Sequence, residues 1–320
     1  MPVRLPPLPV RPATSADEAA IIELLRISLG EESTDKNEAF WRWKHVDNPF
    51  GASPVLIAED AGRIAGVRAF MPWEWKSADR TYRALRAVDT ATHPDYRGRG
   101  IFKMLTMELI ERCREEGYDF IFNTPNEQSR PGYLKMGWQS LGKVPLQLAP
   151  VAPFELVKTL LVSPPPPLEL PTSTFSSLAD PNAFLWLKEA YSDSGWTTPR
   201  SKEFLLWRYA NCPARTYFLA ADPDSYLIIY YARRQRVGNE LRIVEYLVRP
   251  GREAAAKASL GNLRRQLRPT VMTAAPSSRL PFYFLPPRKL GLILTYRALN
   301  LGSPVALTDW HYSLGDLELF

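Results

Sequence analysis

The sequence predicts two tandem units of the α/β (α+β) class, each with a mixed, mostly antiparallel central sheet flanked by helices. Three observations support this prediction. The length of 320 residues suits two domains. The first half is patterned as helix, antiparallel strands, glycine turn, helix and strand. Motifs of the first half then recur in order in the second. We expect a first domain over 1–162, a proline-rich linker over 163–178 and a second domain over 179–320.

The first half opens with a helix and a three-stranded meander. A Ser-Ala-Asp-Glu capping-box pattern at 15–18 precedes apolar residues at helical spacing. Three apolar stretches rich in β-forming residues follow, separated by short turns: Val55–Glu59, Ile64–Lys76 and Tyr82–His93. Trp73 and Trp75 alternate on the second stretch and therefore share one face of the sheet. We expect them in the core or between the two units.

A basic glycine-rich turn at 97–100 follows the third strand and opens the next predicted helix, Ile101–Glu116. One face of that helix carries an apolar stripe of Phe102, Leu105, Leu109 and Cys113. The amides of the first helical turn have no partner within the helix, and the helix dipole adds positive charge there. Because glycine lets a ligand approach the backbone closely, this turn is suited to a pyrophosphate group.

Two other phosphate-binding motifs do not fit this turn. A Rossmann turn needs a third glycine, which is absent here. It also needs an acidic residue at the end of the next strand, whereas Asp119 stands before that strand. A P-loop needs Gly-Lys-Ser or Gly-Lys-Thr, which does not follow. The stretch Thr92–Ile101 instead resembles the acyl-CoA signature of the GNAT N-acetyltransferase superfamily. Arg97, Gly100 and Phe102 fall on its three fixed positions, although Phe102 replaces the usual glycine or alanine.

A second element, about 30 residues further on, strengthens the resemblance. It is similar to the Asn…Tyr-x-Lys-x-Gly-Phe element that follows the fifth strand of the superfamily, and it consists of Asn126, Tyr133, Lys135, Gly137 and Trp138. Two elements in the right order are more specific than either alone. Together the resemblance covers residues 10–148 and implies a GNAT fold for the first half.

The resemblance also implies a mechanism and its residues. An amine would attack the thioester of acetyl-CoA or another acyl-CoA directly, without a metal, and Tyr133 would protonate the leaving thiolate as general acid. The cofactor would be held by main-chain and side-chain groups of Ala91, Thr92, His93, Arg97, Gly98, Arg99, Gly100, Ile101, Phe102 and Asn126. The general base stays open among Asp89, Glu74, Glu127 and a chain of water molecules.

The second half repeats structural motifs of the first half but lacks the residues expected to bind the cofactor and to act as general acid. Phe40, Trp43 and Pro49 align with Phe204, Trp207 and Pro213 at one constant offset of 164, and two later matches follow at shorter offsets. The position of the glycine turn is taken by 253–256, Glu-Ala-Ala-Ala, and that of Tyr133 by Pro287. We therefore expect a degenerate GNAT-like domain that shapes the acceptor site.

The composition argues against several classes of protein and partner. Two cysteines and three histidines argue against a disulfide scaffold and a metal cluster. The net charge of +6 suits an anionic cofactor, and the scatter of the basic residues argues against nucleic acid as a partner. Without a signal peptide or membrane span, we expect a cytoplasmic protein. A sugar, peptide or small-molecule amine could be the acceptor. A non-catalytic CoA-binding scaffold and a Fem-type transferase using charged tRNA stay open as alternatives.

Overall fold

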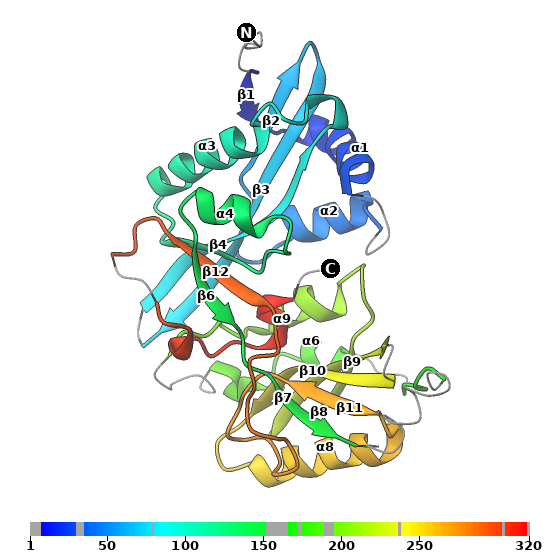
Figure 1. The fold of residues 1–320 in the computed structure, drawn as a ribbon. Helices are drawn as coiled ribbons and strands as arrows, with labels where there is room; N and C mark the ends of the chain where they lie inside the picture. Colours follow the sequence, from blue (N-terminus) through cyan, green and yellow to red (C-terminus); the bar gives the residue numbers. More distant parts are fainter. Residues whose placement is uncertain are drawn as a thin grey trace.

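A computed structural model describes residues 8–29, 35–78, 80–151, 166–171, 175–188, 195–235, 238–302 and 305–318. It contains two mixed sheets, one above the other in Figure 1, and confirms the predicted α+β class. The first sheet has the strand order β1-β2-β3-β4-β5-β12-β6, and the second β7-β11-β10-β9-β8. The predicted limits of the linker fall partly outside the described residues. No helix among the described residues is long and apolar enough to cross a membrane.

Most of the first sheet follows the predicted order. Its strands are β1 (Val10–Pro12), β2 (Val55–Asp60), β3 (Arg63–Ser77), β4 (Arg80–Thr92), β5 (Phe120–Asn123) and β6 (Gln139–Lys143). Its helices are α1 (Glu18–Leu29), α2 (Glu38–His45), α3 (Ile101–Glu115) and α4 (Arg130–Lys135). The capping box before α1 is displaced by one residue from the prediction. Thr14 is extended and bonds the Asp17 carboxylate through both its amide and its hydroxyl, so the first turn starts at Ser15.

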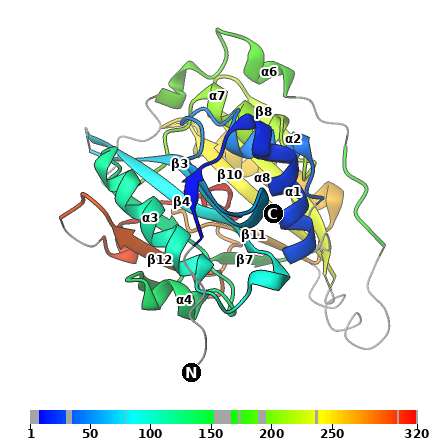
Figure 2. The same ribbon diagram turned by 90° about the horizontal axis from the view of Figure 1, so that it is seen from above.

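Helices cover both faces of the first sheet, as Figure 2 shows for α1 and α3 on opposite sides of β3 and β4. The face under α3 and α4 is packed by Phe70, Leu85 and Ile121 together with the α3 stripe. The opposite face packs against α1 and α2 and against the second sheet. Trp73 and Trp75 are buried on that opposite face, in the cluster shared by the two units, which confirms the interpretation of their alternation.

The second sheet is built from β8 (Phe218–Asp222), β9 (Tyr226–Gln235), β10 (Gly238–Val248) and β11 (Val271–Ala274), with α8 (Glu253–Leu267) packed on its outer face. As β4 and β5 do in the first sheet, β10 and β11 run parallel on either side of a helical crossover. The second half also has three short helices, α6 (Ser176–Ala179), α7 (Lys202–Leu205) and α9 (Leu314–Leu317), and Figure 1 shows α9 between the two sheets. The crossover topology of the first unit is thus repeated in the second.

The two sheets exchange a strand. β12 (Ile293–Ala298) comes from the second half of the chain but lies between β5 and β6 in the first sheet, antiparallel to both. Conversely, β7 (Gln147–Pro150) comes from the first half and pairs with β11 at the edge of the second sheet. Figure 1 shows the orange β12 in the upper sheet and the green β7 in the lower one. Each unit therefore completes its sheet with a strand from the other half.

An approximate two-fold relation between the units is visible at their contact. The indole nitrogen of Trp43 donates to the carbonyl of Trp207 at 2.7 Å, and that of Trp207 donates to the carbonyl of Trp43 at 2.7 Å. The two rings stack with centroids 5.1 Å apart. These are the tryptophans that the sequence repeat aligned, so a matching pair of residues makes a reciprocal contact, as expected for a duplicated fold.

Candidate active site

Strands β4 and β5 pair only briefly before they part. Their parallel register covers Ala84–Arg86 against Phe120–Phe122, whereas β4 continues to Thr92. In the described part of the chain, no strand pairs with the β5-facing edge of β4 beyond that point. The main-chain groups on this edge are available to a ligand, because backbone amides and carbonyls need partners.

The glycine turn lies at the end of this open edge. Gly98 and Gly100 have φ of 77° and 76°, the left-handed region that favours glycine. No atom lies within 4 Å of where a Cβ would stand at either position. Gly100 is the N-cap of α3 and has no side chain to cap the helix, so the first amides of α3 stay available. The turn therefore has the two features on which the predicted anion site depends, left-handed glycines and helix amides that no side chain caps.

The remaining predicted cofactor residues differ in their surroundings. Arg97 is exposed, Arg99 lies 5.3 Å from the Tyr96 ring centroid, and Ile101 is buried under the sheet. The His93 amide donates to Ala65, and its ring accepts from the Asp95 amide, so its side chain stabilises the turn.

Two of the other predicted cofactor residues already pair within the sheet. Ala91 and Thr92 pair with β3 on one edge of β4, which leaves only their other edge for a cofactor. The Asn126 side-chain oxygen accepts from Ser129, both from its amide and from its hydroxyl. A cofactor contact by Asn126 would therefore use its amide nitrogen.

Tyr133 packs against Phe102, which follows the glycine turn in the first turn of α3. The two rings meet edge to face with centroids 5.7 Å apart, and Tyr133 also packs on Trp138 at 5.0 Å. Tyr133 is only 4% exposed, and within the described residues its hydroxyl has no hydrogen-bond partner. Pro131 occupies the first turn of α4, where no amide is needed, so the helix forms despite the Pro-Gly pair.

The three carboxylates considered as the general base lie in different surroundings. Glu74 pairs across the sheet with Arg83, beyond the β4–β5 pairing and away from the glycine turn, and burial raises the pKa of its carboxyl. Glu127 is exposed after β5. Asp89 lies at a β-bulge of β4 near the open edge, so it is the best placed of the three.

Asp89 is, however, held in a buried ionic cluster that the sequence reasoning did not find. Its carboxylate accepts from Lys44 at 2.9 Å and from His45 at 2.7 Å, and the other His45 nitrogen lies 2.8 Å from the Ser53 hydroxyl. Burial alone would raise the pKa of Asp89, but the charge of Lys44 and the hydrogen bond from His45 outweigh it and lower that pKa. Burial lowers the pKa of His45.

The comparisons with known proteins agree with this geometry. A family profile described as an acetyltransferase (GNAT) domain matches residues 9–141. Residues 9–141 form a GNAT acetyltransferase domain. A curated relative, the L-amino acid N-acyltransferase MnaT of Escherichia coli, is 28% identical over 118 residues. That match spans 34% of this chain and 64% of the relative, less than two thirds of its length.

Solved structures share the fold over both units. A probable N-acyltransferase of Enterococcus faecalis superposes with a TM-score of 0.65 at 12% identity, covering 91% of this chain and 72% of the other. A GCN5-related N-acetyltransferase of Kribbella flavida gives 0.61 at 16%, covering 92% and 71%. Eis1 of Mycobacterium abscessus gives 0.57 at 13%, covering 91% and 74%. The fold of the GNAT domain with its second sheet is therefore shared with these proteins.

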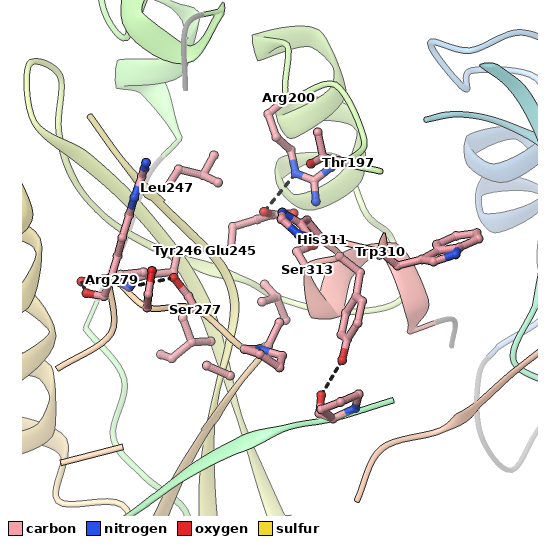
Figure 3. Close-up of a pocket in the computed structure, with 18 of the residues that line it drawn as sticks. Thr197, Arg200, Glu245, Tyr246, Leu247, Ser277, Arg279, Trp310, His311 and Ser313 are labelled. Atoms are coloured by element: carbon pink, nitrogen blue, oxygen red, sulfur yellow. Dashed lines mark hydrogen bonds and ion pairs between the residues drawn. The ribbon is translucent and has the colours of Figure 1, made fainter. Parts of the chain in front are cut away.

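The second unit has a cavity of about 450 Å³ beside β10 and the segment that follows β11, the counterpart of the open edge in the GNAT domain. Figure 3 shows Tyr246, Ser277 and Arg279 on one side of it and His311 and Ser313 on the other. The turn before α8 has one glycine in the left-handed region, Gly251 with φ of 80°, but its amide donates to the Glu253 carboxylate, and α8 then starts with Glu253 and alanines.

At the position of Asp89, the second unit has Glu245. This buried carboxylate accepts from Tyr209, Arg200 and Ser313. Burial raises the pKa of Glu245. A buried carboxylate thus stands at this position in both units, whereas among the described residues a turn with two left-handed glycines opens α3 and not α8.

Proposed function

We propose that the protein is an acyl-CoA-dependent N-acyltransferase whose reaction takes place in the GNAT domain. The observation that carries the proposal is the uncapped glycine turn at the open edge of β4, with the Tyr133 phenol packed on Phe102 beside it. The amides of 97–102 would bind the pyrophosphate of CoA, with Arg97 and Arg99 adding positive charge. The edge of β4 from Ala91 to His93 would bind the pantetheine arm.

In the proposed reaction an amine attacks the thioester carbonyl, and the tetrahedral intermediate collapses to an amide and CoA thiol. Tyr133 gives the proton that the leaving thiolate takes up, as a tyrosine hydroxyl positioned as a general acid can do. A water chain removes the proton of the attacking amine, because the lowered pKa and two ionic partners of Asp89 make it a poor base. The relative named L-amino acid N-acyltransferase supports an amino-group acceptor.

Two measurements test the proposal. Calorimetry with CoA should give one binding site per chain, and a thiol assay with acetyl-CoA and a panel of amines should give turnover. Tyr133→Phe should lower turnover at least ~10-fold, within the range for a general acid, with little change in CoA affinity.

Tyr296→Phe is the matched control. The Tyr296 hydroxyl is buried without a hydrogen-bond partner among the described residues, and its ring lies on the other face of the sheet. CoA binding without thiol release on any amine would favour the scaffold alternative, and a folded protein that does not bind CoA would refute the proposal.

A further inference from the structure

One buried arginine of the GNAT domain makes no ion pair with any residue that the structure describes. Arg68, on β3, is fully buried, and its Nη1 donates to the carbonyl of Val88 at 3.1 Å. Its Nε and Nη2 are buried and have no hydrogen-bond partner, and no carboxylate pairs with it among the described residues. A buried charge left in this state is costly, because desolvation is not offset by an ion pair.

The guanidinium of Arg68 lies inside the proposed site. Its central carbon is 4.6 Å from the Phe70 ring centroid, 5.8 Å from that of Phe102 and 5.4 Å from that of Tyr133. Phe102 is the last residue of the acyl-CoA signature, and Tyr133 is the proposed acid. Val88 belongs to the β-bulge of β4. Arg68 therefore lies between Phe102 of the proposed cofactor turn and Tyr133, the proposed acid.

The unused donors have a particular geometry. Nε–H and the Nη2–H beside it point the same way along one edge of the guanidinium, so that edge offers two parallel hydrogen bonds, which match the two oxygens of a carboxylate. Arg200 in the second unit uses the same two nitrogens for Glu245 and Asp316, at 3.0 and 2.6 Å. A thioester carbonyl can accept both hydrogen bonds on one oxygen but carries no charge to neutralise the buried guanidinium, whereas a carboxylate does both.

We propose that Arg68 is a substrate-binding residue that holds a carboxylate of one of the two reactants. The carboxylate comes either from the far end of a dicarboxylic acyl group on CoA or from an acceptor of the amino-acid type. It reaches the guanidinium past Phe102 and Tyr133, whose rings supply only part of the stabilisation that a buried cation needs. The inference rests on the proposed acyltransferase function.

Two pairs of substrates separate the sources. With a carboxylate-free amine, turnover of succinyl-CoA is compared with that of butyryl-CoA. With acetyl-CoA, an L-amino acid is compared with its carboxamide. In one pair the carboxylate-bearing reactant should have a kcat/KM at least ~10-fold higher, as expected for a charge-assisted bidentate contact. Arg68→Met should bring this ratio close to one, and Arg68→Lys should reduce it in part.

Each ratio is taken within one variant, so a general loss of activity cancels. Arg83→Met is the matched control, because Arg83 is an exposed arginine of the same sheet away from the turn, and it should keep the wild-type ratio. Equal kcat/KM values within both pairs in the wild-type enzyme would overturn the proposal without any variant. So would a ratio that survives in Arg68→Met. A protein that does not bind CoA refutes the proposed function, and the Arg68 proposal falls with it.

Discussion

Replacing Gly100 by alanine separates the backbone cost of the glycine turn from its role in binding CoA. Gly100 has φ of 76°, and beyond its neighbours in the chain no described residue comes within 4 Å of its would-be Cβ, so the methyl group causes no clash with them. The cost to folding is then the left-handed conformation alone, about 1–2 kcal/mol for an L-residue. For a chain of this size that corresponds to a fall in Tm of a few degrees, at roughly 2–4 °C per kcal/mol.

Gly62 offers a matched control. It has φ of 84° in the turn between β2 and β3, with the same open space around its would-be Cβ, and it lies outside the proposed site. Gly62→Ala and Gly100→Ala should therefore lose similar amounts of stability in a thermal melt. Only Gly100→Ala should weaken CoA binding in calorimetry, by at least ~10-fold, because its methyl group keeps the pyrophosphate from the amides. Equal CoA affinity in the two variants would refute the assignment of the turn.

Two further predictions concern stability. Trp43→Phe and Trp207→Phe each remove one of the reciprocal hydrogen bonds and leave a buried carbonyl unpaired. Each should therefore lower the free energy of unfolding by about 2 kcal/mol more than Trp75→Phe, because the Trp75 indole nitrogen is buried without a partner among the described residues. Denaturant unfolding measures the difference, and equal losses for all three variants would contradict the prediction. Because the folded-state pKa values of His45 and Asp89 are both lowered, the unfolded chain takes up their protons first, and stability should fall as pH drops below about 6.5. His45→Gln should flatten this loss between about pH 7 and 5, and an unchanged slope in urea melts would show that His45 is not its source.

Local pattern was enough to predict the order of elements in the GNAT domain, the glycine turn and the repeat. Each of these features depends on short stretches of sequence: the spacing of apolar residues, the residue types of a turn and the spacing within a motif. Trp43 and Trp207, which the repeat aligned, also meet at the contact of the two units, although the alignment itself did not predict that contact. Phe102 and Tyr133, which the two motifs singled out, have their rings in edge-to-face contact.

The strand exchange and the ionic partners of Asp89 could not be predicted in this way. β7 and β12 are short, and the sequence of a short strand does not specify which sheet it joins. Lys44 and His45 meet Asp89 across more than 40 residues, so only the tertiary fold reveals that cluster. Arg68 interrupts an apolar strand, and its burial depends on the later residues Phe102 and Tyr133.

The exchange of β7 and β12 also determines when the first sheet can be completed during synthesis of the chain. The gap between β5 and β6 is filled by β12, so the first sheet stays incomplete until residues 293–298 have left the ribosome. At ~5–20 residues per second, this is roughly 10–30 seconds after β5. During that time the edges of β5 and β6 are open to incorrect pairing with other chains. A nascent chain of this protein therefore has to be protected at one defined edge until the second half has been made.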